Sequence, residues 1–325
     1  MDNPYPDFGG YPVKRSPGFF ETLGDEDTIH EVSFNHTKWY CFPFYIRLLK
    51  NIKKIDCWDN RIYRIPSWLM THQELEYIDL SFNRISTVPK EIFNLPALHT
   101  LLLRTNHSPV FKKAKDFISA ENNLQVLDLR NNFYKQLPSE IRLFKNLKEL
   151  HLGLCGLPEL PEYIFELTEL EWLDLSSNIL TAISPEIKNL KNLKHLNIGS
   201  WFDVLNYYEA GNRIQKLSKE IGELSQLTFL DISSNPLKNI PEEIGNLTNL
   251  EVLIADEIDC EFPLEILKNF KKLKELCLCK VEINTAFIDL IASLQHLQEL
   301  DLIDFFDEKG YEELKSIFPH LDIRW

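Results

Sequence analysis

The feature that most limits what this chain can fold into is a sequence repeat. One unit begins LEYIDLSFNRISTVPKEIFNLPA at Leu75, and the next unit begins 23 residues later at Leu98. The apolar positions of this unit recur along most of the chain. The units begin at Ile29, Ile52, Leu75, Leu98, Leu124, Leu147, Leu170, Leu193, Leu227, Leu250, Leu273 and Leu297. Length alone would allow two domains, but these units follow one another without a linker. They therefore predict one domain of stacked repeats, because no unit can bury its apolar face alone.

Each unit begins like a short β-strand. Ile78 and Leu80 alternate with Tyr77 and Asp79, so the apolar side chains point inward and the others outward. Stacked units pair such strands in parallel, about 4.8 Å apart. A Leu-Pro half follows, and proline suits the first position of a helical turn. Helical turns are bulkier than strands, so we expect a curved molecule with the sheet on its concave side.

An asparagine recurs where each strand ends. Its short amide can hydrogen-bond the backbone groups that a sharp corner leaves free, so stacked units should form a ladder of such bonds. The asparagines are Asn60, Asn83, Asn106, Asn132, Asn178 and Asn235. Cys155 takes this place in one unit, and Ile258, Val281 and Phe305 take it in the last three. The ladder should therefore weaken toward the C-terminal end.

The pattern L-x-x-L-x-L-x-x-N-x-L, followed by L-P-x-x-I-x-x-L, resembles the leucine-rich repeat family over roughly residues 29–325. It is most similar to the intracellular type found in Ras-group scaffolds and many bacterial proteins. The resemblance implies an α/β fold, a right-handed horseshoe of about 12 repeats. It also implies a parallel sheet on the concave face, short α or 3₁₀ turns on the convex face and a protein-binding role. We expect a single domain over 29–325, including a C-terminal cap, after an N-terminal cap or partly disordered segment at 1–28.

The composition excludes several functions. A net charge of −14 argues against binding to nucleic acid or an anionic membrane surface. The sequence contains no phosphate-binding glycine loop and no metalloprotease or hydrolase motif, so we expect no enzyme activity, cofactor or metal. No secretory signal is recognisable at the start and the six cysteines have no framework spacing, which predicts a cytoplasmic protein with free thiols.

The outward strand positions supply a candidate binding surface. Large rings and arginines gather there, and these residue types are enriched at binding hot spots. A parallel sheet is normally covered on both faces, so rings on an open face favour a protein partner. The alternative is that the rings stack on one another and only cover the sheet. Together with the insertion described below, the candidate partner-binding residues are Trp58, Tyr77, Asp79, Phe82, Arg104, Asp128, Arg130, His151, Trp172, Asp174, His195, Trp201, Phe202, Tyr207, Tyr208, Phe229 and Asp231.

Aspartate recurs at the middle outward position of the strands. The residues are Asp56, Asp79, Asp128, Asp174, Asp231 and Asp301. One interpretation is an acidic stripe that binds a basic partner, and the other is that aspartate belongs to the repeat and keeps the sheet soluble. For any single aspartate we favour the second interpretation.

One long insertion interrupts the repeats between Leu193 and Leu227. The stretch GSWFDVLNYYEAGN contains Trp201, Phe202, Tyr207 and Tyr208, and the pattern resumes at Asn212. The extra residues, 201–211, should leave the corner at the end of a strand and form a loop on one rim. We expect its rings to overhang the concave face, although a loop that packs on itself is the alternative.

These observations predict a non-catalytic scaffold that binds a protein partner, one with a basic surface if the aspartates take part. More specific alternatives are an inhibitor or immunity-like protein that wraps an enzyme, and the targeting module of an enzyme. The sequence does not predict an oligomeric state.

Overall fold

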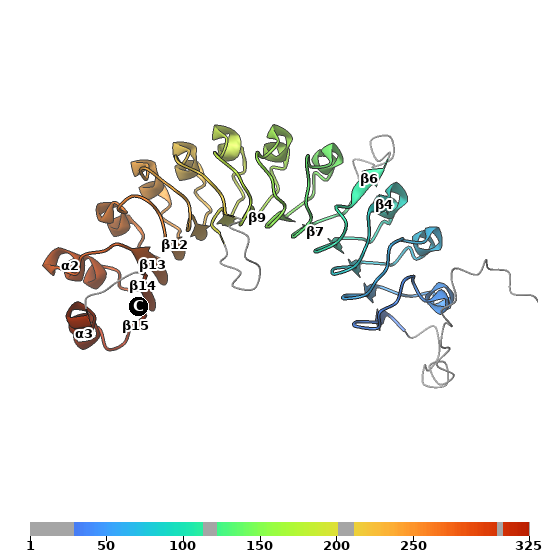
Figure 1. The fold of residues 1–325 in the computed structure, drawn as a ribbon, viewed down its shortest axis with the longest axis horizontal. Helices are drawn as coiled ribbons and strands as arrows, with labels where there is room; N and C mark the ends of the chain where they lie inside the picture. Colours follow the sequence, from blue (N-terminus) through green and yellow to red (C-terminus); the bar gives the residue numbers. More distant parts are fainter. Residues whose placement is uncertain (1–28, 113–121, 201–210, 304–307, 325) are drawn as a thin grey trace, which may run out of the picture.

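The molecule is a curved solenoid whose strands line the inner arc (Figure 1). The computed structural model describes residues 29–112, 122–200, 211–303 and 308–324. In these residues a 13-stranded parallel sheet runs from one end of the arc to the other. Its strands are β1 (Glu31–Ser33), β2 (Lys54–Asp56), β3 (Tyr77–Asp79), β5 (Thr100–Leu102), β7 (Val126–Asp128), β8 (Glu149–His151), β9 (Trp172–Asp174), β10 (His195–Asn197), β11 (Phe229–Asp231), β12 (Val252–Ala255), β13 (Glu275–Cys279), β14 (Glu299–Ile303) and β15 (Asp322–Arg324). The predicted leucine-rich repeat solenoid of about 12 repeats is confirmed.

Every strand pairs with its neighbour at the same repeat position. Leu196 of β10 lies opposite Leu173 of β9 on one side and Leu230 of β11 on the other. The register therefore continues across the insertion between β10 and β11. As a result, residues at one repeat position form a straight column across the sheet.

The convex side consists of short helical turns (Figure 1). Their bounds are η2 (Phe44–Leu48), η3 (Ser67–Thr71), η4 (Lys90–Asn94), η6 (Ser139–Leu143), η7 (Glu162–Glu166), η8 (Pro185–Asn189), η9 (Lys219–Glu223), η10 (Glu242–Asn246), η11 (Leu264–Asn269), α2 (Thr285–Ser293) and α3 (Glu308–Ile317), where η marks a 3₁₀ helix. The expectation that the repeat proline occupies the first helical position is wrong by one residue. Pro66 precedes η3 in an extended conformation, and its carbonyl accepts the first helical bond from the Leu69 N–H at 3.1 Å.

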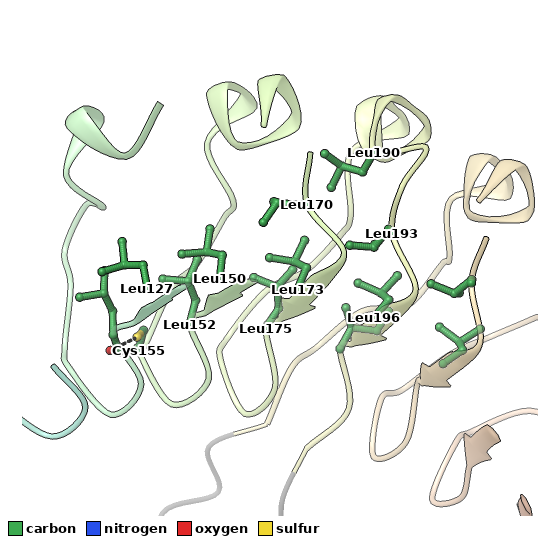
Figure 2. Packing of buried hydrophobic residues seen from close by; sticks show 14 of the residues in the cluster. Leu127, Leu150, Leu152, Cys155, Leu170, Leu173, Leu175, Leu190, Leu193 and Leu196 are labelled. Atoms are coloured by element: carbon green, nitrogen blue, oxygen red, sulfur yellow. Dashed lines mark hydrogen bonds between the residues drawn. The ribbon is translucent and has the colours of Figure 1, made fainter. Parts of the chain in front are cut away.

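The core is a set of parallel aliphatic rows. Figure 2 shows Leu127, Leu150, Leu173 and Leu196 in one such row, and all four are fully buried. Each of these side chains is covered by its counterparts in the units before and after. Truncation of a buried leucine to alanine typically costs about 2–5 kcal/mol, so these shared rows hold neighbouring units together.

The asparagine ladder is present as predicted. Asn178 is fully buried, its Nδ2 donates to the carbonyls of Leu152 and Leu175 at 2.9 Å, and its Oδ1 accepts from the Leu157 N–H at 3.0 Å. Where cysteine replaces asparagine, the Cys155 thiol donates to the Leu129 carbonyl at 3.2 Å (Figure 2).

The ladder also changes near the C-terminal end, as predicted. Ile258 occupies the asparagine position there and is 1% exposed. A buried aliphatic group thus replaces the amide.

Two further features complete the architecture. Strands β4 (Thr87–Pro89) and β6 (Val110–Lys112) form a separate two-stranded sheet beside the main one. At the C-terminal end, β15 pairs with β14. The side chains of Leu314, Phe318 and Leu321 are buried there, whereas Ile317 is 45% exposed. In the described parts of the chain, no helix has the length and apolar character needed to cross a membrane.

Candidate protein-interaction surface

The outward residues of the concave sheet form three columns. The first column contains Tyr77, Trp172, His195 and Phe229, because in-register pairing places equivalent strand positions side by side. The second column, two residues later, holds most of the aspartates. The third column lies another two residues along the chain, just past the ends of the strands. It contains Trp58, Arg104 and Arg130.

Three rings of the first column are stacked across adjacent strands. The ring of His195 lies between those of Trp172 and Phe229, with centroid distances of 3.4 and 3.8 Å and interplanar angles of 10° and 12°. Trp172 remains 37% exposed. Trp172, His195 and Phe229 are called the ring stack below. They give the centre of the concave face a row of three stacked rings.

The ring stack changes the charge state of its histidine. Burial, together with a smaller effect of the neighbouring His151, lowers the pKa of His195 to about 3. The ordinary histidine pKa is about 6.5, so His195 is uncharged at neutral pH. The ring stack therefore presents no positive charge of its own.

The aspartates of the second column are mostly used inside the molecule. Asp174 and Asp231 are 7% and 5% exposed. The Oδ1 of Asp231 accepts hydrogen bonds from the backbone N–H and the hydroxyl of Ser233, at 2.9 and 2.6 Å. Asn197 Oδ1 accepts from the Gly199 N–H in the same way at 2.9 Å. At these strands the column thus caps the backbone amide two residues later.

Two glycines make room for these buried carboxylates. A Cβ on Gly199 would clash with the Asp231 carboxylate of the next strand, and a Cβ on Gly153 would lie 2.7 Å from the Ser176 Oγ. Burial also raises the pKa of Asp231 to about 6, although the Ser233 donors oppose this shift. Gly199 comes just before the insertion, so the chain leaves the sheet beside this buried carboxylate.

A second group of rings lies nearer the N-terminal end of the face. Trp58 contacts His36 and Phe82 edge-on, at centroid distances of 4.4 and 5.5 Å, and the Arg104 guanidinium lies 5.4 Å from the Phe82 ring centroid. Phe82 has a φ of 54°, a left-handed conformation that is unusual for a bulky residue. Lys54 similarly lies over the Tyr77 ring at 5.1 Å.

The predicted rings thus fall into two groups, and the strand β7 between them carries the buried carboxylate of Asp128. The structure places Trp58, Phe82 and Arg104 together, and His151, Trp172, His195 and Phe229 together. Trp201, Phe202, Tyr207 and Tyr208 lie outside the described residues. Sequence reasoning overlooked His36, although its offset of 23 residues from Asp59, with which it pairs at 2.6 Å, was a usable signal.

Potential metal ligands are scattered in the described residues, and one outward thiol, that of Cys277, stays protonated. No group of three or more potential ligand side chains comes together in those parts of the chain. Burial raises the pKa of Cys277 far above its ordinary value, which keeps it a thiol.

The long parallel sheet of in-register units, with its open, ring-bearing concave face, defines a solenoid repeat protein. The chain is a leucine-rich repeat protein. Family models match it as "Leucine-rich repeat region" over residues 204–320 and as "Leucine rich repeat" over residues 50–107 and 169–190. Domains of this kind are generally non-catalytic and commonly bind proteins.

Known proteins resemble different parts of the chain. Toll-like receptor 2 of Equus caballus is 28% identical over 129 residues, 38% of this chain and 16% of the receptor, so the chain spans a small part of that relative. A leucine-rich repeat protein of Leptospira interrogans has a TM-score of 0.65 at 26% identity, covering 91% of this chain and 84% of its own. An internalin of Listeria monocytogenes has a TM-score of 0.68 at 20% identity, covering 92% and 87%.

Proposed function

We propose that this protein binds a protein partner through its concave face and acts without catalysis. The observation that carries this proposal is the ring stack, in which Trp172 remains partly exposed on an open parallel sheet. Such a sheet is normally covered on both faces. A partner that covers these rings would remove apolar area from water at about 25 cal/mol per Å².

The binding mechanism rests on a preformed surface. The ring stack and the second group of rings, Trp58, His36 and Phe82, are held by in-register strands. Few side chains therefore need to be ordered on association. The insertion at 201–211 follows β10, the strand that carries His195 of the ring stack, and we propose that its four aromatic residues join the same contact.

The finer role that we propose is that of a scaffold. An inhibitor that wraps an enzyme and the targeting module of an enzyme are the alternatives. The net charge of −14 supports a partner with a basic surface, because opposite charges accelerate association. The buried aspartates add little direct contact, so we expect charge to act on the association rate, and raising the salt concentration should slow association.

We further propose that the repeats are of the intracellular, Ras-group-like type and that the protein is cytoplasmic. The spacing of 23 residues and the Leu-Pro half-repeat support the subtype. All six cysteines are free, and three of them are buried, which fits a reducing compartment. Detection of the protein in a secreted or membrane fraction of its native cells would contradict this location.

Site-specific photo-crosslinking tests the proposed function. A photoreactive phenylalanine is placed at Trp172 in one variant and at Phe133 in another. Phe133 is 75% exposed but lies past the asparagine corner, outside the three columns. We expect a covalent adduct with a cellular protein from position 172 and none from position 133. Equal adducts from both positions, or none from position 172, would contradict binding at the concave face.

A further inference from the structure

Two arginines at the same position of neighbouring repeats have different surroundings. Arg104 follows strand β5 and Arg130 follows strand β7, which pair in register. Arg130 binds both oxygens of Asp128 on its own repeat, with its Nη2 2.6 Å from Oδ2 and its Nε 3.1 Å from both oxygens. Its charge is therefore already neutralised within the protein.

Arg104 lacks this partner because Leu102 stands where β7 has Asp128. Leu102 lies in register between Asp79 and Asp128, so it interrupts the aspartate column at one strand. Among the described residues, no carboxylate forms an ion pair with Arg104, and its buried Nε has no hydrogen-bond partner. An unsatisfied buried donor destabilises the free protein, and an incoming acceptor would remove that cost.

The nearby carboxylates do not offer an alternative partner. Asp128 is occupied by Arg130, and Asp79 accepts a hydrogen bond from the Ser81 N–H at 2.8 Å. Meanwhile the Arg104 guanidinium lies over the Phe82 ring, 5.4 Å from its centroid. This contact holds the side chain in place before any ligand arrives.

We infer that Arg104 pairs with the carboxylate of an aspartate or glutamate side chain on the protein partner. This inference rests on the proposed function, since it names one contact of the same concave face. A guanidinium offers a planar fork that matches a carboxylate in two hydrogen bonds. The partner thus brings one acid to this point of the face, whatever the sign of its overall charge.

The test uses a hexaglutamate peptide with both ends blocked as the probe and blocked hexaglutamine as its neutral control. The Arg104 Nε–H resonance of the full chain is followed by NMR at constant ionic strength. We expect it to shift in a saturable way with hexaglutamate and to stay fixed with hexaglutamine. No shift with hexaglutamate, or the same shift with both peptides, overturns the inference.

Two substitutions of nearly equal shape separate charge from packing. Leu102→Asp places a carboxylate of the protein itself beside Arg104. Hexaglutamate should therefore bind at least about tenfold more weakly. Leu102→Asn places a neutral group of similar size there and should bind like the unmodified protein. Thermal melting of both variants confirms that they are folded. Equal binding by the two variants overturns the inference.

One further variant separates this inference from the proposed function. Trp172→Ala should weaken partner binding strongly while leaving the Arg104 response to hexaglutamate intact, because the two residues are three strands apart. If partner binding depends on Trp172 but Arg104 does not respond to hexaglutamate, the inference fails and the proposed function stands.

Discussion

The imidazole ring of His195 lies flat against the indole ring of Trp172, with ring centroids 3.4 Å apart and planes inclined by 10°. Phe229 covers the opposite side of the imidazole. Three adjacent strands thus contribute one layer of rings to a face that is otherwise open. Stacked aromatic pairs contribute about 0.5–1.5 kcal/mol of stability in addition to the effect of burying their surface. The three rings therefore stay stacked without a partner, and a partner can still contact them.

The first prediction concerns the charge of His195. Its folded pKa of about 3 lies below the ordinary value of about 6.5. Between pH 3 and about 6.5, the His195 imidazole therefore takes up a proton in the unfolded chain but not in the folded one. The stability that this residue contributes is complete above pH about 6.5 and is lost as the pH falls toward 3. NMR titration should show an imidazole that stays neutral down to pH about 4. A midpoint near 6.5 in the folded protein would contradict the buried stack, and the same titration in urea provides the reference.

The second prediction concerns the buried carboxylate of Asp231. Its pKa is raised to about 6, so its charge destabilises the folded state above that pH, and the cost is relieved as the pH falls toward 4. Asn197 shows that asparagine can make the same backbone bond at this position. Asp231→Asn should therefore increase the free energy of unfolding by about 2 kcal/mol near pH 8. Urea unfolding at two pH values measures this gain. A gain that persists unchanged near pH 4 would contradict the charge explanation.

The third prediction concerns the glycine beside this carboxylate. Gly199→Ala should destabilise the protein by about 1–3 kcal/mol, because the added methyl meets the Asp231 side chain. In a background of Asp231→Gly the same substitution should cost less, since the nearest obstructing side chain is gone and only the Ser233 Oγ, 2.5 Å from the added Cβ, remains. Chemical unfolding of the two single variants and the double variant gives the coupling energy. A coupling near zero would show that the two residues do not constrain each other.

The fourth prediction concerns the insertion. Deleting residues 201–211 joins Ser200 to Asn212, whose N–H already lies 3.1 Å from the Ser200 Oγ. The register of β10 and β11 does not depend on the deleted segment, so the melting temperature should change by only a few degrees. Partner binding should fall strongly. Unchanged binding by the folded deletion variant would exclude the insertion from the contact, and a large loss of melting temperature would show that the insertion supports the fold.

The sequence predicted those features that depend on position within a repeat. The inward leucines such as Leu173, the amide ladder through Asn178 and the outward column of Trp172 all follow from one period, because stacking places equal positions side by side. The sequence also correctly placed Ile258 as a weak point of the ladder.

Features that depend on contacts between different columns could not be predicted. The burial of Asp231 follows from the serine two residues later and from the glycine on the preceding strand, a pairing that one repeat alone does not reveal. The contrast between Arg104 and Arg130 likewise depends on a single substitution, Leu102 for aspartate, within a regular column. Aspartate recurrence was visible in the sequence, but its use as a backbone cap required the geometry of the strand end.

The account depends most on the ring stack as the binding surface. The direct test is the affinity of the crosslinked partner for the unmodified protein, for Trp172→Ala and for Phe133→Ala, measured by titration calorimetry. We predict that Trp172→Ala weakens binding by about 2–4 kcal/mol while Phe133→Ala changes it by less than about 0.5 kcal/mol. Equal affinities of Trp172→Ala and the unmodified protein, with both folded, would contradict the account.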